Sequence, residues 1–305
     1  MISLQNSQQS LAQTETFDVV IIGGGPAGVQ CAMWLKMMQI DVCIFEKRPA
    51  LGGLQHDNPF PYQPIALFEH TVNGRQVGQT IHQSAVNYGV SFRTNVIATE
   101  VNARHGQFDV TFFDGDKSTL IQTTHLVISS GTTVQTGGYI ASERVLIGPG
   151  DHIIAHDFSG KRVAILGGGD NAFENCLYIQ TKNAALVHIY ARTVRARKEF
   201  VQAVPTERIF IGSYLVNSSA STVNAVPYDV IVVMYGWVPS LPYLAKLPVA
   251  MDDKGFLITH PQTTETSVHN LFAIGDVANR MPPSCIAAMA DGIVAARTIR
   301  QRITS

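Results

Sequence analysis

The chain has 305 residues, which is long for one domain and natural for two. Its 22 Lys and Arg residues against 23 Asp and Glu residues give a net charge of −1, which excludes a protein dedicated to binding nucleic acid or anionic lipid. No apolar run reaches the length of a membrane span, and residues 1–16 lack the basic start and apolar core of a secretory signal.

Residues 1–16 are polar, and we expect them to form a disordered tail. The four cysteines are sparse and form no Cys-x-x-Cys pair, which is typical of reduced thiols in a cytoplasmic protein. The ten histidines show no spacing suited to a metal ion, so no metal site is expected.

The first predicted strand ends in a glycine-rich turn. Residues 17–28 read FDVVIIGGGPAG, a β-branched run followed by Gly23, Gly25 and Gly28, and the apolar periodicity of 29–38 predicts a helix. In the spacing G-x-G-x-x-G the first glycine permits a tight turn, the second lets the backbone approach a pyrophosphate, and the third lets the helix meet the strand. The motif therefore predicts a dinucleotide-binding unit, and a glycine turn without a ligand is the less favoured alternative.

A second predicted strand over 42–45 ends at Glu46, which lies 23 residues after Gly23. A carboxylate at this position accepts hydrogen bonds from both hydroxyls of an adenosine ribose. Strand, turn, helix and acid therefore agree on an adenine dinucleotide.

The glycine turn recurs once, 144 residues later in the chain. Residues 161–172 read KRVAILGGGDNA and place Gly167, Gly169 and Ala172 at the spacing G-x-G-x-x-A. The apolar pattern predicts that a helix follows over 171–181. One nucleotide-binding unit is therefore present twice.

The second unit lacks the acid of the first. Its next predicted strand covers 184–190, and counting 23 residues from Gly167 reaches Tyr190. Four basic residues follow: Arg192, Arg195, Arg197 and Lys198. A guanidinium near this ribose corner, from Arg192 or Arg197, matches a 2′-phosphate and favours NADPH over NADH. The alternative is that the four residues form only a solvated basic face.

The remaining predicted elements complete two sheets. Strands are predicted over 125–131, 228–235 and 270–276, and a helix over 286–299. We therefore predict an α/β fold of two Rossmann-like dinucleotide-binding domains. The first domain covers 17–130 and 243–305, and the second domain, 131–242, is inserted into it.

Five motifs in this order resemble the low-molecular-weight thioredoxin reductase group of two-domain flavoproteins: GGGPAG, Glu46 with Gly52-Gly53, the strand end Ser129-Ser130-Gly131, GGGDNAFEN, and FAIGDVA. The resemblance extends over residues 17–299. It implies FAD in the first domain, NADPH in the second domain, and a homodimer.

The resemblance also assigns site residues. The FAD site would comprise Gly23, Gly25, Pro26, Ala27, Gly28, Glu46, Lys47, Gly53, Ile97, Gly131, Gly275, Asp276, Ser284 and Cys285. The NADPH site would comprise Gly167, Gly169, Asp170, Asn171, Ala172, Arg192 and Arg197. Asp276 would accept hydrogen bonds from the ribityl chain, and Ser284 and Cys285 would lie against the flavin pyrimidine edge, where helix N–H groups stabilise negative charge.

The chain departs from the thioredoxin reductases at one decisive point. Those enzymes carry a Cys-x-x-Cys shortly before the second glycine motif, and residues 148–169 contain no cysteine. Without a dithiol, disulfide exchange cannot take place there. In this stretch the chain resembles the thioredoxin-reductase-like ferredoxin–NADP reductases, which implies a ferredoxin or flavodoxin as electron carrier. Only 13 residues follow Gly292, fewer than the extension typical of those reductases, and the segment 200–228 is shorter than usual.

Three functions remain open on this basis. The first is a FAD enzyme that takes hydride from NADPH and passes electrons to an acceptor that is not a dithiol of the same chain. The second is a flavoprotein that no longer uses a nicotinamide and exchanges electrons with a carrier protein or an external thiol through Cys285, because a helix N-terminus beside a flavin lowers the pKa of a thiol. The third is a non-catalytic FAD-binding redox sensor.

Several other residues are expected near the flavin or between the domains. His56 follows Gly53 by three residues and is a candidate to face the flavin. Four aromatic residues lie on predicted loops, where they would stack on a ring or fill the domain interface: Phe60, Tyr62, Tyr235 and Trp237.

Overall fold

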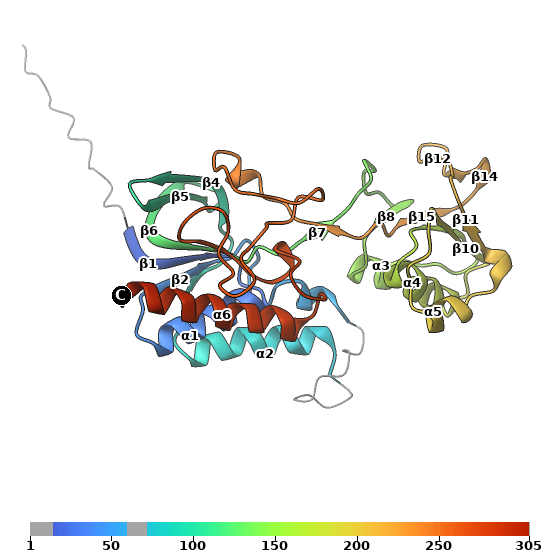
Figure 1. Ribbon diagram of the computed structural model, residues 1–305. Helices are drawn as coiled ribbons and strands as arrows, with labels where there is room; N and C mark the ends of the chain where they lie inside the picture. Colours follow the sequence, from blue (N-terminus) through green and yellow to red (C-terminus); the bar gives the residue numbers. More distant parts are fainter. Residues whose placement is uncertain (1–14, 60–71, 305) are drawn as a thin grey trace, which may run out of the picture.

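A computed structural model describes residues 15–59 and 72–304. Figure 1 shows two lobes joined by two short crossings of the chain. The first lobe, blue and red in the figure, holds the beginning and the end of the described chain, and the second lobe, green to yellow, holds the segment between the crossings. Each lobe is built on a parallel sheet, so the predicted α/β fold is confirmed.

The first lobe contains a parallel sheet extended by an antiparallel meander. The parallel strands are β1 (Glu15–Ile22), β2 (Val42–Phe45), β3 (Ser91–Arg93), β6 (Ser118–Ile128) and β17 (Leu271–Ala273), in the order β3-β2-β1-β6-β17. Strand β5 (Gln107–Phe113) pairs antiparallel with the first half of β6 on one side and with β4 (Ile97–Arg104) on the other. The four residues of β2 are all buried, as expected for a strand covered on both faces.

Three helices cover one face of this sheet: α1 (Pro26–Met37), α2 (Gly74–Asn87) and α6 (Cys285–Ile303). They bury one apolar cluster against the sheet, and the meander together with the segment 241–278 buries a second cluster on the other face. Helix α6 lies along α1, so the C-terminal segment completes the unit that the first glycine turn begins (Figure 1).

The observed boundaries correct the predictions at several places, two of them around the first glycine turn. Strand β1 begins at Glu15 and pairs Glu15 with Ile121, so the assignment of residues 15 and 16 to a disordered tail was wrong. Residues 1–14 lie outside the described part of the chain. Helix α1 begins at Pro26, three residues before the predicted start. The N–H groups of a first helical turn have no acceptor within the helix, so proline, which has no N–H, is well suited to that position.

The second lobe repeats the plan on a smaller scale. Its parallel sheet has the order β11-β10-β9-β15-β8, formed by β8 (Val145–Ile147), β9 (Arg162–Leu166), β10 (Leu186–Ala191), β11 (Ile209–Ile211) and β15 (Val230–Val233). Its helices are α3 (Asp151–Ala155), α4 (Asp170–Gln180) and α5 (Lys198–Gln202). A small meander follows β11, with strands β12 (Val216–Asn217), β13 (Thr222–Val223) and β14 (Val226–Pro227).

The two crossings between the lobes pair with each other. Strand β7 (Thr133–Val134) and strand β16 (Trp237–Val238) are antiparallel, with Trp237 opposite Val134. The N–H of Gln135 also donates to the carbonyl of Gly236 at 2.8 Å. Across the described residues, no helix combines the length and the apolar character that a membrane span requires.

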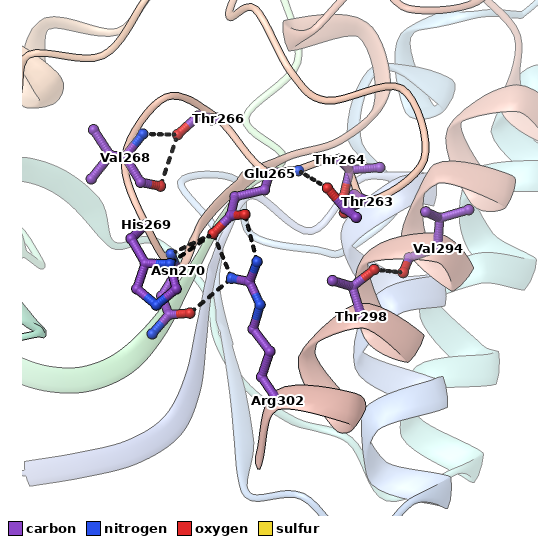
Figure 2. A network of polar contacts seen from close by, with 10 residues as sticks. All are labelled: Thr263, Thr264, Glu265, Thr266, Val268, His269, Asn270, Val294, Thr298 and Arg302. Carbon is purple, nitrogen blue, oxygen red and sulfur yellow. Dashed lines mark hydrogen bonds and ion pairs between the residues drawn. The ribbon is translucent and has the colours of Figure 1, made fainter. Parts of the chain in front are cut away.

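A polar network fixes the end of α6 to the loop before β17 (Figure 2). The Arg302 guanidinium donates to both carboxylate oxygens of Glu265, and to Oδ1 of Asn270 at 2.9 Å. The Asn270 N–H donates to the same carboxylate at 2.8 Å. Arg302 holds the pKa of Glu265 below its usual range. The network ties the C-terminal helix to the strand that leads into the predicted FAD motif.

Candidate functional site

A single cavity of about 2170 Å³ lies between the two lobes, and both glycine turns line it. Pockets for one small molecule are typically about 300–1,000 Å³. The cavity is therefore large enough for two dinucleotides that meet between the lobes.

The first glycine turn distributes three roles among three glycines. Gly23 has φ +104°, and a Cβ there would lie 2.5 Å from the Ser129 carbonyl oxygen at the end of β6. A Cβ on Gly28 would press against the Gly23 carbonyl and lie 2.5 Å from Oγ of Ser129. Gly25 caps α1, and a Cβ there would meet nothing within 4 Å. Gly23 and Gly28 are therefore required by packing. Gly25 faces open space, where a pyrophosphate would approach the first N–H groups of α1.

Glu46 follows β2 and is only 4% exposed, at the edge of the cavity. Its Oε2 accepts from the N–H of Gly24 at 2.6 Å, and its Oε1 accepts from the N–H of Arg48 at 2.8 Å. A carboxylate has about four lone-pair positions. These two hydrogen bonds fix the carboxylate and leave acceptor capacity for the two hydroxyls of a ribose.

Helix α6 begins at the cavity. Ser284 caps it by accepting from the N–H of Ala287 at 3.1 Å, and Cys285 is its first residue. Asp276 lies in the short helical turn η4 (Gly275–Val277), which also lines the cavity. Burial raises the pKa of Asp276, and the nearby Asp291 carboxylate adds to that effect.

Asp291 is a site residue that the sequence did not indicate. It is 6% exposed, and its Oδ2 accepts from the N–H of Gly275 at 3.1 Å. Its Oδ1 lies 3.5 Å from Nη1 of Arg280. A buried carboxylate thus fixes the turn that presents Asp276 to the cavity. Within α6 its sequence neighbours are apolar or small, and no motif marked it.

The second glycine turn has the same geometry with one substitution. Gly167 has φ +149°, and a Cβ there would collide with the Met234 carbonyl at the end of the neighbouring strand, β15. Gly169 caps α4, and a Cβ on it would meet nothing within 4 Å. Ala172 stands at the third position and is fully buried. The open N-terminus of α4 therefore faces the cavity as that of α1 does.

The register of the second unit corrects the proposed equivalence of Tyr190 with Glu46. The Gly23 N–H donates to the Phe45 carbonyl, and the Gly167 N–H donates to the Tyr190 carbonyl. Tyr190 therefore corresponds to Phe45, and Ala191 corresponds to Glu46. The count from the glycine failed because the second connection is one residue longer. Tyr190 itself packs in the sheet core, yet the position after it still carries no acid.

The basic run after β10 lies on the cavity wall. Arg192, Arg195 and Arg197 all line the cavity. Arg197 donates through Nε to Asp170 at 2.9 Å, at the first turn of α4. Within residues 15–59 and 72–304, Arg192 and Arg195 form no ion pair. Two guanidinium groups are therefore available for an added anion, and one of them, Arg195, was not assigned to the site from the sequence.

The cavity gathers most of the predicted site residues. From the first lobe it is lined by Gly23, Gly25, Pro26, Ala27, Glu46, Lys47, Gly53, Ile97, Gly131, Gly275, Asp276, Ser284 and Cys285. From the second lobe it is lined by Gly167, Gly169, Asp170, Asn171, Arg192 and Arg197. Gly28 and Ala172 lie behind the two turns, at the helix-packing positions.

The aromatic candidates and His56 differ in whether they line the cavity. Tyr235 and Trp237 line the cavity at the crossing between the lobes. His56 does not line the cavity: its Nε2 donates to the Leu51 carbonyl at 2.7 Å and its ring packs against Gly78, and its place beside the flavin stays a prediction. Phe60 and Tyr62 lie outside the described residues.

All four cysteines are buried thiols, and none forms a disulfide. Burial raises the pKa of Cys31 well above its usual range, and raises the pKa values of Cys43 and Cys176 to about 12. Thiolates are the reactive form, so these three cysteines are inert. Cys285 alone among the four lines the cavity. The chain therefore brings no pair of thiols to the site.

A family model described as pyridine nucleotide-disulphide oxidoreductase matches residues 17–292. The chain belongs to this family. A ferredoxin–NADP reductase from Levilactobacillus brevis is 27% identical over 292 residues, which cover 86% of this chain and 86% of that protein. A thioredoxin reductase from Borreliella burgdorferi is 25% identical and covers 91% of this chain and 89% of its own length.

Solved structures share the fold. The thioredoxin reductase from Lactococcus lactis has a TM-score of 0.75 at 22% identity and covers 94% of this chain and 99% of its own. The bacillithiol disulfide reductase Bdr from Bacillus cereus has a TM-score of 0.78 at 17% identity, over 94% and 100% of the two chains. The resemblance to thioredoxin-reductase-like flavoproteins is confirmed, and the protein is an FAD-dependent NAD(P)H oxidoreductase.

Proposed function

We propose that this oxidoreductase uses NADPH and FAD to reduce an acceptor outside its own chain, an electron carrier of the ferredoxin or flavodoxin type. One observation carries the proposal. The same cavity is lined by Glu46 after the second strand of the first unit, by Arg192 after the second strand of the second unit, and by one cysteine thiol, that of Cys285. A relay through a disulfide needs two thiols within reach of each other. Electrons therefore leave for an external acceptor directly.

The residues of the first turn fit FAD. The first N–H groups of α1 and the open position at Gly25 would receive the pyrophosphate, and Glu46 would accept from the adenosine ribose. Asp276 would hold the ribityl chain, and the N-terminus of α6 would place N–H groups at the pyrimidine edge. When bound, FAD supplies hydride acceptance from a nicotinamide and electron donation to the acceptor.

The residues of the second turn fit NADPH. Ala191 provides no carboxylate to repel a 2′-phosphate, and Arg192 follows it directly on the cavity wall. Arg195 lies close by, since its N–H donates to the Gly168 carbonyl at 2.7 Å and folds the basic run over the glycine turn. The guanidinium groups would bind the phosphate through charge-assisted hydrogen bonds.

Cys285 supports a second candidate function. It begins α6 and lines the cavity, so an external disulfide that entered the cavity would meet this thiol. The Cys285 thiolate would attack the external disulfide, form a mixed disulfide and release one thiol; an external thiol would then attack the mixed disulfide, restore Cys285 and release a new disulfide, so the route exchanges thiols and disulfides and consumes no nicotinamide. This route predicts turnover with small disulfides that disappears in Cys285→Ser.

The test is an anaerobic titration with NADPH and, separately, with NADH, followed by a panel of acceptors. We expect loss of the oxidised flavin absorbance with NADPH, rapid reoxidation by a ferredoxin or flavodoxin, and undetectable reduction of thioredoxin. Cys285→Ser should reduce the carrier at the wild-type rate. Thioredoxin turnover, or carrier turnover that is lost in Cys285→Ser, would overturn the proposal. A flavin that neither nucleotide reduces would show that the protein does not use a nicotinamide.

A further inference from the structure

The two lobes can be aligned residue by residue through their strand registers. In the first lobe β2 pairs Phe45 with Arg93 of β3, and in the second lobe β10 pairs Tyr190 with Phe210 of β11. Phe45 and Tyr190 are equivalent, because each carbonyl accepts from the first glycine of its turn. Arg93 and Phe210 are therefore equivalent as well.

Four residues beyond these partners, the chain enters the meander of each lobe. In the first lobe this position is Ile97, the first residue of β4, and in the second lobe it is Tyr214, two residues before β12. Both residues line the cavity. Ile97 is a predicted contact of FAD, so Tyr214 occupies the corresponding position beside the second nucleotide unit.

The surroundings of Tyr214 hold its ring in place. Its hydroxyl donates to the Tyr235 hydroxyl at 3.2 Å, and its ring centroid lies 5.8 Å from that of the buried Tyr190. The Tyr214 side chain is half-buried, and its remaining surface reaches the cavity wall that Arg192 also lines. An aromatic ring fixed on one side and open on the other is a platform for a second planar ring.

We propose that Tyr214 is the aromatic contact for the adenine ring of the nucleotide bound by the second lobe. This inference rests on the proposed use of NADPH. Adenine is common to NADPH and NADH, and the 2′-phosphate distinguishes them. Tyr214 therefore sets the affinity for both nucleotides, whereas Arg192 sets the choice between them.

The test measures binding of two fragments without nicotinamide, so it is independent of flavin reduction. Adenosine 2′,5′-bisphosphate and 5′-AMP are titrated into the FAD-loaded protein by calorimetry. A stacked base contributes roughly 1–3 kcal/mol by alanine substitution, so Tyr214→Ala should weaken both fragments about 5- to 150-fold, and by equal factors. Tyr214→Phe keeps the ring and should bind both fragments as the wild type does.

Two variants separate ring contact from loss of structure. Tyr214→Leu keeps apolar volume but removes the aromatic ring, so it should weaken both fragments while leaving the melting temperature near that of the wild type. Tyr88→Ala removes an exposed tyrosine of the first lobe and should change neither fragment. Wild-type affinity in both Tyr214→Ala and Tyr214→Leu would overturn the inference while the proposed function stands. Failure of the wild type to bind either fragment would overturn both.

Discussion

The two glycine turns have the same backbone register and different chemistry beyond it. In both lobes the first glycine donates to the end of the second strand, and the second glycine caps a helix at open space. The next residue differs, since Glu46 follows the strand in the first lobe and Ala191 ends it in the second. Packing thus fixes the turn, and we expect the residues at the end of the second strand to select the nucleotide.

The third position of the motif shows that the first turn is also the tighter one. A Cβ on Gly28 would meet the Gly23 carbonyl and Oγ of Ser129, so only glycine fits. In the second lobe Ala172 carries that Cβ and is fully buried. The first lobe is closed further by α6, which the polar network of Glu265 and Arg302 ties down (Figure 2). These features suit a retained cofactor in the first lobe and an exchanging nucleotide in the second.

The strongest test of the difference between the two lobes replaces the glycine that caps the first helix of each unit by valine, one at a time. In Gly25→Val the backbone is not strained, because φ is −71° and no atom lies within 4 Å of the added Cβ. The side chain would instead fill the space of the pyrophosphate. We expect a folded protein that retains almost no FAD after gel filtration, measured as the flavin-to-protein absorbance ratio.

Gly169→Val is the matched control. Gly169 has φ −96° and equally open surroundings at the start of α4. We expect full FAD content and loss of reduction by NADPH. If Gly25→Val retained stoichiometric FAD, the first turn would not be the FAD site; if Gly169→Val lost FAD, the assignment of the two lobes would be exchanged.

The next largest effect concerns the 2′-phosphate. Arg192→Ala removes a guanidinium that has no competing ion pair among the described residues, and charge-assisted hydrogen bonds contribute about 1.5–3 kcal/mol. The half-saturating NADPH concentration should rise by about one to two decades while that for NADH stays unchanged. Steady-state kinetics with both nucleotides measure the difference.

Arg197→Ala provides the internal comparison. Arg197 already donates to Asp170, so part of its hydrogen-bonding capacity is committed within the protein. Its loss should weaken NADPH by a smaller factor than the loss of Arg192. Equal weakening of NADPH and NADH in both variants would assign the arginines a structural role only.

A smaller effect on nucleotide preference should follow when the second lobe receives a glutamate at the position that Glu46 occupies in the first lobe. Ala191→Glu places a carboxylate at the position equivalent to Glu46, where it would repel a 2′-phosphate and accept from a 2′-hydroxyl. The preference for NADPH over NADH, taken as the ratio of kcat/KM values, should fall by about tenfold, since a charged hydrogen-bond partner contributes about 1.5 kcal/mol or more. An unchanged ratio in a folded variant would show that the ribose lies elsewhere.

The sequence predicted the central parallel strands and both glycine turns because these carry local signals, whereas it did not predict the short strands β3, β8 and β11. β-branched runs and positive-φ glycines are required by packing against neighbouring strands, as at Gly23 and Gly167. The predicted equivalence of Tyr190 with Glu46 was wrong, because the connection from the glycine turn to the end of the second strand is one residue longer in the second lobe. The hydrophobic pattern does not show such a difference. Only the hydrogen-bond register shows that Ala191 takes the place of Glu46.

The residues that the sequence did not reveal reach the site through tertiary packing. Asp291 lies on α6, far along the chain from the first glycine turn, and acts through the N–H of Gly275. Tyr214 follows a short strand whose partner is fixed only by the sheet. His56 differs from these residues, because a local contact holds it: its Nε2 donates to the Leu51 carbonyl five residues earlier, and it does not line the cavity.

The smallest predicted effect distinguishes the lobes by their response to acid. Arg302 lowers the pKa of Glu265 in the folded first lobe, so this pair stabilises the protein above the ordinary glutamate pKa of about 4.3, and its contribution is lost as the pH falls through the lowered value. Glu265→Gln should therefore reduce the free energy of unfolding by about 1 kcal/mol at pH 7 and by progressively less in acid. Denaturant unfolding of both proteins between pH 7 and pH 3, monitored by flavin release, measures the difference.

Glu143→Gln, a change in the second lobe on a residue without an ion pair among the described residues, should show no such dependence. A deficit in Glu265→Gln that stays constant with pH would mean that the side chain stabilises α6 through packing and not through its charge.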